Sequence, residues 1–203
     1  MKKTILLSAA VASLTLTAFT VKKSHTDVYK VDPKQSSLEW FAEKVTGKHN
    51  GTIMLSGGTL QDNHGQLSGT VEIDMTTIAN KDLESPEWGG KLETHLKSPD
   101  FFDAAKYPKS TFVISSITPI ANAKPDGFTH KVKGMLTIKD KTNEVAFDAV
   151  LKTQEKNIVC VGSAIVDRSK YDIRYGSKTF FPNIGDKMIN DEFTLKFTVV
   201  AVK

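Results

Sequence analysis

Hydrophobic and polar residues alternate with a period of two along most of the chain. In one run, Val71, Ile73 and Met75 are separated by Glu72 and Asp74. Neighbouring side chains on a β-strand point to opposite faces, so this alternation gives a strand one apolar and one polar face. Antiparallel sheets commonly bury one face and leave the other in water. The alternation therefore predicts an antiparallel sheet with a single buried face.

Short polar stretches separate the alternating segments and are typical of hairpin connections. The stretches 62–65 and 139–143 contain the Asp, Asn or Gly residues that tight turns favour. Many short strands with turns between them are typical of a sandwich or a barrel. We expect roughly eight strands, at 37–45, 51–61, 66–76, 109–118, 128–138, 144–154, 158–168 and 187–202.

The segment 85–106 breaks the alternation and has the signals of helix starts. Ser85 is followed by Pro86, and a serine caps free N–H groups while proline fits the first helical turn. Ser98 and Pro99 repeat this pattern, which predicts a second, shorter helix. We therefore expect a short helical insertion at 85–106 within the β-structure.

The first twenty residues have the composition of a secretory signal peptide. Lys2 and Lys3 form a positive start, and the stretch 5–21 is apolar, rich in small residues and free of acidic residues. A membrane anchor is the alternative, although serines and threonines dilute the apolar stretch. We expect residues 1–20 to be removed, leaving a periplasmic or secreted protein without a membrane span.

Composition and charge limit the class of protein and the kind of partner that the chain can have. The chain has 203 residues, 39% of them hydrophobic and 25% charged, which fits one globular domain with its own core. Its net charge is +4, and it falls to +2 without Lys2 and Lys3. So small an excess, interspersed with acidic residues, does not predict a nucleic-acid partner.

Signatures of catalysis and of metal binding are absent from the sequence. There is no nucleophile elbow and no His-Glu-x-x-His pair. The five histidines have no ligand-like spacing, and the single cysteine, Cys160, lies in an apolar run typical of a small buried side chain. We therefore expect no enzyme, no disulfide and no metal site.

The pair Asp167 and Arg168 ends an apolar strand, so one of the two side chains can point inward. Adjacent strand residues face opposite sides, and the two are therefore not expected to pair with each other. Two interpretations stay open. The inward group meets the polar head of a ligand, or it forms an ion pair that ties down the loop that follows.

Two Phe-Phe pairs lie in connections between strands, where polar residues are usual. They are Phe101 with Phe102 and Phe180 with Phe181. Aromatic side chains of this size are normally buried. The pairs either plug one barrel end as ordinary core or form the mouth of an apolar cavity.

Several segments resemble the polyisoprenoid-binding YceI-like family. They are 31–40 with its Val-Asp-Pro start, 98–103 with Ser-Pro-Asp-Phe-Phe-Asp, 134–139 with Gly-Met-Leu-Thr-Ile-Lys, and 167–173 with Asp-Arg-x-x-Tyr-x-Ile. The resemblance covers residues 29–202, and the Asp-Phe-Phe-Asp segment is its most specific part. It implies a lipocalin-like, eight-stranded antiparallel barrel in the periplasm. It also implies a long isoprenoid or fatty chain held in the apolar interior, with no catalytic residues.

The expected ligand contacts follow from one phase of the alternation, from the first Phe-Phe pair and from the strand-end arginine. An eight-stranded barrel has room for filling side chains or for one small ligand. Gly69 with Gly134, or Gly162 with Ala164, would leave space inside. The predicted ligand-binding residues are Trp40, Val71, Ile73, Phe101, Phe102, Phe112, Leu136, Phe147, Ile165, Arg168, Phe193 and Phe197.

The sequence thus favours a carrier for an elongated apolar lipid, such as a polyisoprenoid, an isoprenoid quinone or a fatty chain. No cofactor is expected apart from a bound lipid, and the protein is expected to be a monomer or homodimer. One alternative is a ligand-free stress-response or surface interaction module with a side-chain-filled barrel. A lipid enzyme would need an inward carboxylate or histidine with a shifted pKa, and no motif indicates one.

Overall fold

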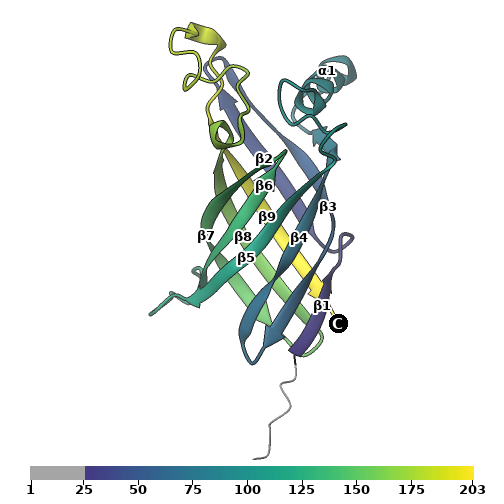
Figure 1. Cartoon of the computed structure of the whole chain (residues 1–203), viewed down its shortest axis with the longest axis vertical. Coiled ribbons are helices and arrows are strands. Elements are labelled where there is room, and N and C mark those ends of the chain that lie inside the picture. Colours follow the sequence, from purple (N-terminus) through teal and green to yellow (C-terminus); the bar gives the residue numbers. More distant parts are fainter. Residues whose placement is uncertain (1–25) are drawn as a thin grey trace, which may run out of the picture.

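The computed structural model describes residues 26–203, so the predicted signal peptide lies outside the described part. All strands belong to one antiparallel sheet that curls into a barrel (Figure 1). The strands are β1 (Thr26–Val31), β2 (Ser37–Lys44), β3 (Gly47–Asn63), β4 (Gln66–Asn80), β5 (Lys109–Pro119), β6 (His130–Ile138), β7 (Lys141–Thr153), β8 (Asn157–Asp167) and β9 (Glu192–Val202).

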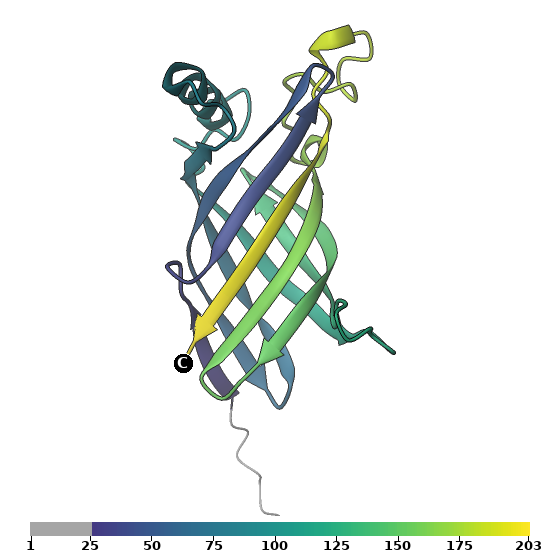
Figure 2. The same cartoon turned by 180° about the vertical axis from the view of Figure 1, so that it is seen from behind.

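Pairing between β3 and β4 closes the barrel. The order runs β3, β2, β9, β8, β7, β6, β5, β4 and then back to β3; β2, β9 and β8 run side by side in Figure 2. Strands β1 and β2 share one position, because β2 pairs with the first residues of β3 and β1 with the last. The ring therefore has eight positions, which confirms the eight-stranded barrel.

Strand β1 was not predicted from the sequence. It has six residues, and only Tyr29 and Val31 of its side chains are buried. Two inward positions are too few for the alternation to stand out from its surroundings. Its pairing with β3 and with the end of β9 supplies the hydrogen bonds that make it a strand.

Helix α1 (Pro86–Lys97) begins where the sequence predicts it. The Ser85 side chain accepts a hydrogen bond from the Trp88 backbone N–H at 3.5 Å, and Pro86 occupies the first turn. Leu92 and Leu96 pack against the barrel core. The helix therefore covers one side of the barrel end.

The second predicted helix, after Ser98, does not form. The backbone N–H of Phe102 donates to the carbonyl of Leu96 at 3.1 Å, and that of Ala104 to the carbonyl of Lys97 at 2.9 Å. The chain thus folds back to satisfy the last carbonyls of α1, which a new helix would leave free. Residues 98–106 are turns, and the insertion contains one helix.

Two segments cover the same end of the barrel, opposite the C-terminus (Figure 1). One, the helical cap, comprises residues 81–108. The other, the capping loop, comprises residues 172–191 and contains the 3-10 turn η2 (Gly185–Lys187); it follows the 3-10 turn η1 (Arg168–Tyr171). The last strand begins at Glu192 and not at the predicted residue 187, because the intervening residues belong to the capping loop.

Candidate functional site

The barrel interior contains two apolar cavities. The upper one, of about 90 Å³, lies next to the two caps, and the lower one, of about 100 Å³, lies deeper between the strands. Leu38, Ile73, Leu136 and Leu195 line both cavities. The two cavities are therefore adjacent compartments, separated by a waist made of these four side chains.

The roof of the upper cavity comes from both caps. Leu96, Phe101 and Phe102 belong to the helical cap, whereas Ile189 and Asn190 belong to the capping loop. The predicted insertion at 85–106 therefore supplies only part of the roof. The roof is discontinuous in sequence, so the two caps have to be held together for the cavity to stay closed.

Aromatic rings make the contact between the two caps. His95 of α1 lies 4.5 Å from the Tyr175 ring of the capping loop, centroid to centroid, and 5.0 Å from Phe101. Phe101 and Tyr175 are 5.4 Å apart. These edge and tilted contacts are favourable geometries for aromatic pairs, and they fasten the helical cap to the loop.

Three phenylalanine rings form one wall of the lower cavity. Phe147 lies 5.6 Å from Phe112 and 5.1 Å from Phe197, measured between ring centroids. Cys160 also lines this cavity, and burial raises the pKa of its thiol to about 11. The lower cavity is therefore an apolar space whose one thiol is held in its neutral form.

The interior glycines do not leave the space that the sequence suggested. A side chain at Gly134 would collide with the Phe112 ring, and one at Gly162 would lie 3.0 Å from the Phe197 ring. Gly69 makes way for the backbone of β3, which approaches it closely. The aromatic rings thus occupy the space that side chains at the glycine positions would take, and the cavities lie beside these rings.

All but one of the residues predicted to bind a ligand line the cavities. The sequence predicted which residues of each strand face inward but not which of the two cavities each one lines. The upper cavity has Trp40, Ile73, Phe101, Phe102, Leu136, Arg168 and Phe193. The lower cavity has Val71, Ile73, Phe112, Leu136, Phe147 and Phe197.

Ile165 is the exception, and the prediction that it faces inward was wrong. Its side chain is 62% exposed, whereas its neighbours Ala164 and Val166 are buried. Strand β8 is apolar on both faces, with Val161 also exposed, so its alternation does not reveal which face is inside. A shift of one residue exchanges the two faces of a strand.

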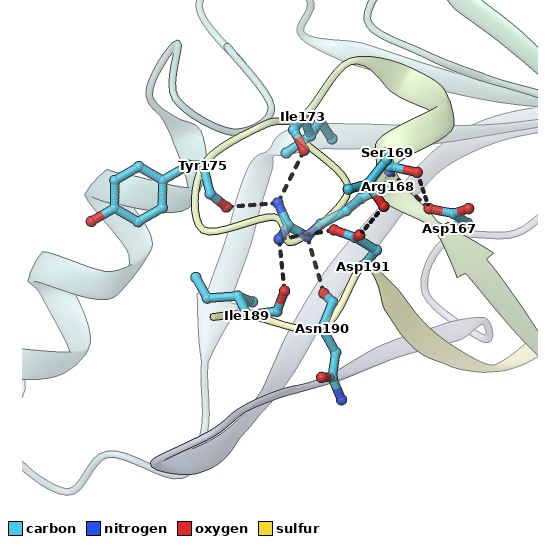
Figure 3. A network of polar contacts seen from close by, with 9 residues as sticks. Asp167, Arg168, Ser169, Ile173, Tyr175, Ile189, Asn190 and Asp191 are labelled. Carbon is cyan, nitrogen blue, oxygen red and sulfur yellow. Dashed lines mark hydrogen bonds and ion pairs between the residues drawn. The ribbon is translucent and has the colours of Figure 1, made fainter. Parts of the chain in front are cut away.

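The Arg168 side chain points toward the capping loop, and the backbone of that loop nearly encloses the guanidinium (Figure 3). Nε donates to the carbonyl of Asn190 at 3.1 Å, and Nη2 to that of Ile189 at 3.0 Å. Nη1 donates to the carbonyls of Ile173 at 3.0 Å and Tyr175 at 2.8 Å. One guanidinium thus joins both ends of the loop to the end of β8.

Asp191 completes this arrangement as the counter-ion. Its Oδ1 lies 3.3 Å from Nη2 of Arg168, and the Thr179 hydroxyl donates to its Oδ2 at 2.7 Å. Burial raises the pKa of Asp191, but hydrogen bonds and the Arg168 charge outweigh this effect, and the net pKa lies below its ordinary value. Burial lowers the pKa of Arg168, against the opposing charge of Asp191.

Of the two interpretations of the strand-end pair, the structure supports the loop tie. An arginine has five N–H groups, and carbonyls and a carboxylate surround those of Arg168. Arg168 borders the upper cavity, yet its guanidinium donates its hydrogen bonds to the capping loop. Asp167 caps η1 instead, accepting from the N–H and hydroxyl of Ser169 at 2.9 and 2.6 Å.

The second Phe-Phe pair lies outside the barrel. Phe180 and Phe181 line an outer groove of about 1030 Å³ along the capping loop, together with Tyr175. Phe181 is 50% exposed, and the Arg174 guanidinium lies 5.0 Å from the Phe180 ring. The pair therefore neither plugs the barrel nor forms its mouth.

Part of the cavity lining was not predicted from the sequence. Leu38 and Leu195 of the waist share the alternation phase of Trp40 and Phe193, so a signal for them was available. Ser110, two residues before Phe112, also lines the upper cavity. A single serine on an inward phase carries no sequence signal that separates it from a surface serine.

Between residues 26 and 203, no group of three or more His, Cys, Asp or Glu side chains is placed to hold a metal ion. No helix in this part of the chain is both long and apolar enough to span a bilayer.

Proteins of Staphylococcus aureus have similar sequences. A UPF0312 protein of Staphylococcus aureus strain MRSA252 is 30% identical over 159 residues, which span 72% of this chain and 82% of the relative. A UPF0312 protein of strain bovine RF122 / ET3-1 is 29% identical over 161 residues, with the same coverage.

Solved structures share the fold at low sequence identity. Burkholderia cenocepacia BcnA has a TM-score of 0.63 at 23% identity, covering 85% of this chain and 99% of that one. A polyisoprenoid binding domain from Saccharophagus degradans has a TM-score of 0.56 at 13% identity, covering 86% and 97%. The family model described as the YceI-like domain matches residues 29–201. The chain therefore belongs to the YceI-like domain family.

Proposed function

We propose that this protein is a carrier that holds the apolar chain of a lipid inside its barrel and catalyses no reaction. Two adjoining apolar cavities within a closed barrel carry this proposal. The similar domain from Saccharophagus degradans is described as polyisoprenoid binding, which supports the same ligand class here. The binding domain is assigned to residues 29–202.

Burial of apolar surface supplies the binding energy. Each roughly 100 Å² of apolar ligand surface removed from water stabilises a complex by about 2.5 kcal/mol. A chain that passes from one cavity to the other displaces the waist side chains, above all Leu195, which is only partly buried. Isoprenoid and fatty chains are thin and flexible enough for such a path, so length matters more than detailed shape.

Export is part of the proposal. Residues 1–20 have the charged start and apolar stretch of a secretory signal, and removal of this segment would leave the barrel domain in the periplasm or outside the cell. A mass spectrum of the protein purified from its own host tests this, because a cleaved signal shortens the chain by about twenty residues. Retention of the full N-terminus would contradict export by this route.

Tryptophan fluorescence tests lipid binding. Trp40 lines the upper cavity, whereas Trp88 is 60% exposed on α1. A Trp88→Phe variant therefore leaves a single reporter in the cavity. Titration of the delipidated variant with a long isoprenoid quinone is expected to quench Trp40 with saturation at one equivalent. The matched Trp40→Phe variant, which reports from the surface, is expected to show no saturable change.

Native mass spectrometry of the host-purified protein, followed by lipid extraction, identifies the ligand. A single class of long-chain lipid bound in one copy is the expected result. Absence of any lipid, together with unsaturable quenching of Trp40, would overturn the carrier proposal.

The outer groove favours a second candidate, an interaction module. Tyr175 is 47% exposed and Phe181 is 50% exposed in this groove, and exposed aromatic clusters often mark association sites. If the groove joins two copies of the chain, native mass spectrometry shows a dimer that Phe181→Ser abolishes. A monomer at all concentrations would contradict this use of the groove.

A further inference from the structure

Ser110 is a buried hydroxyl that faces the upper cavity. It is the second residue of β5, pairs in register with Ile73 of the waist, and is 2% exposed. Its Oγ has no hydrogen-bond partner within residues 26–203. The next inward residue on the same strand, Phe112, lines the lower cavity. One strand thus presents a polar group to one compartment and an aromatic ring to the other.

A buried hydroxyl without a partner is costly, and nearly all such groups in folded proteins are hydrogen-bonded. A water molecule is a poor partner for Ser110, because a buried water needs two to four polar contacts. The surrounding lining of the upper cavity, including Ile73, Met75 and Ile138, is overwhelmingly apolar. A ligand that brings its own polar group satisfies Ser110 better than a water does.

Charge narrows the class of that polar group. Arg168 is the one cationic residue in the lining, and the capping-loop carbonyls and Asp191 occupy its guanidinium. A carboxylate or phosphate in the cavity would therefore be buried without a free counter-ion, which proteins avoid. Asn190 of the roof is also uncharged. The lining suits an uncharged head.

We propose that the upper cavity binds the uncharged hydrogen-bonding head of a lipid, an alcohol, a quinone carbonyl or an amide, through the Ser110 hydroxyl. The chain of that lipid continues past the waist into the lower cavity. This inference rests on the proposed carrier function and adds the head-group class and the residue that selects it. Ser110 is therefore a specificity residue for head groups and has little part in affinity for a bare chain.

Matched probes of one chain length test the head-group assignment. They are a C20 isoprenoid alcohol, the hydrocarbon without the hydroxyl and the corresponding acid at pH 8, delivered from cyclodextrin. Their affinities are measured by the recovery of Trp40 fluorescence as each displaces a bound isoprenoid quinone. Wild-type protein is expected to bind the alcohol about three- to tenfold more tightly than the hydrocarbon, the effect of one neutral hydrogen bond. The acid is expected to bind more weakly than the alcohol.

The Ser110→Ala variant identifies the residue responsible. Its affinity for the hydrocarbon is expected to stay unchanged while the preference for the alcohol falls to about onefold. Ser115→Ala, on the exposed part of the same strand, is the matched control and is expected to keep the preference. A melting temperature equal to or above that of wild type shows that Ser110→Ala folds normally, because the variant loses a buried hydroxyl that has no partner.

The outcomes separate this inference from the carrier proposal. Equal alcohol preference in wild type and Ser110→Ala, or tighter binding of the acid than of the alcohol, would overturn the head-group assignment while leaving the carrier intact. Failure of wild-type protein to bind any of the three probes would overturn both.

Discussion

Nη1 of Arg168 and the carbonyl oxygen of Tyr175 lie 2.8 Å apart, a hydrogen bond that ties the middle of the capping loop to the end of β8. The Tyr175 ring in turn contacts His95 of the helical cap. Arg168 therefore reaches both caps through one loop residue. Because both caps roof the upper cavity, closure of the barrel end depends on this arginine.

Replacement of Arg168 by methionine is expected to destabilise the protein by roughly 3 kcal/mol, because removal of one partner leaves buried groups unpaired. The four carbonyls and Asp191 lose their shared donor. Chemical denaturation measures the effect, and hydrogen exchange is expected to accelerate across residues 172–191.

Arg174→Met is the matched control for that substitution. Arg174 pairs with Asp172 at 2.6 Å on the surface, with 61% of its side chain exposed, and exposed pairs contribute little. A change of under about 0.5 kcal/mol is expected. Equal stability of both variants would show that Arg168 does not hold the loop.

Acid is expected to loosen the capping loop through Asp191. The pKa of Asp191 in the folded protein lies below its ordinary value of 3.8, so its contribution to stability is fully present above that value and is lost as the pH falls through the folded pKa. The protection factors of the loop amides, which correct for the intrinsic pH dependence of hydrogen exchange, are expected to fall between about pH 6 and about pH 3. Asp191→Asn is expected to remove this pH dependence, and an unchanged profile would exclude Asp191 as its source.

Cys160 is expected to resist alkylation in the native protein. With a pKa of about 11, roughly one thiol in a thousand is ionised at pH 8, and the thiolate is the reactive form. Iodoacetamide labelling followed by mass spectrometry is expected to be about a hundredfold slower than for a free cysteine. Denaturant is expected to restore the ordinary rate, and rapid labelling of folded protein would show that the lower cavity is open to solvent.

The Gly90→Ala substitution is expected to stabilise helix α1. Gly90 lies in the helix interior, and no atom lies within 4 Å of the place a side chain would take. Alanine in such a position is worth about 0.5–1 kcal/mol over glycine, which thermal unfolding detects.

Gly176→Ala provides the opposite case in the capping loop. Its φ of +65° disfavours a side chain, and the Ile189 side chain would lie 2.9 Å away. Loss of stability is expected for this variant. Destabilisation by both substitutions would mean that α1 is packed more tightly than its contacts indicate.

Much of the barrel was predictable because its strands repeat the same alternation of apolar and polar residues. Where a strand has a clear polar face, as in the stretch from Val71 to Met75, the alternation identified the inward side correctly. Helix α1 was predictable for a similarly local reason, since Ser85 and Pro86 act within one turn. The resemblance to the YceI-like family joined these segments into one barrel.

The strand count of the ring, the start of the helix and most of the apolar lining could be predicted from the sequence, because periodicity and capping are properties of neighbouring residues. Three features became visible only in the folded chain: Ile165 faces water, the Arg168 guanidinium binds the capping loop, and Ser110 lacks a hydrogen-bond partner among the described residues. Each of these depends on strand register or on partners distant along the chain, as when Arg168 meets Ile189. Hydrogen bonds and strand pairing bring together residues that are neighbours in space but distant along the chain. The spacing of residue types along the chain does not show which of these distant groups will meet.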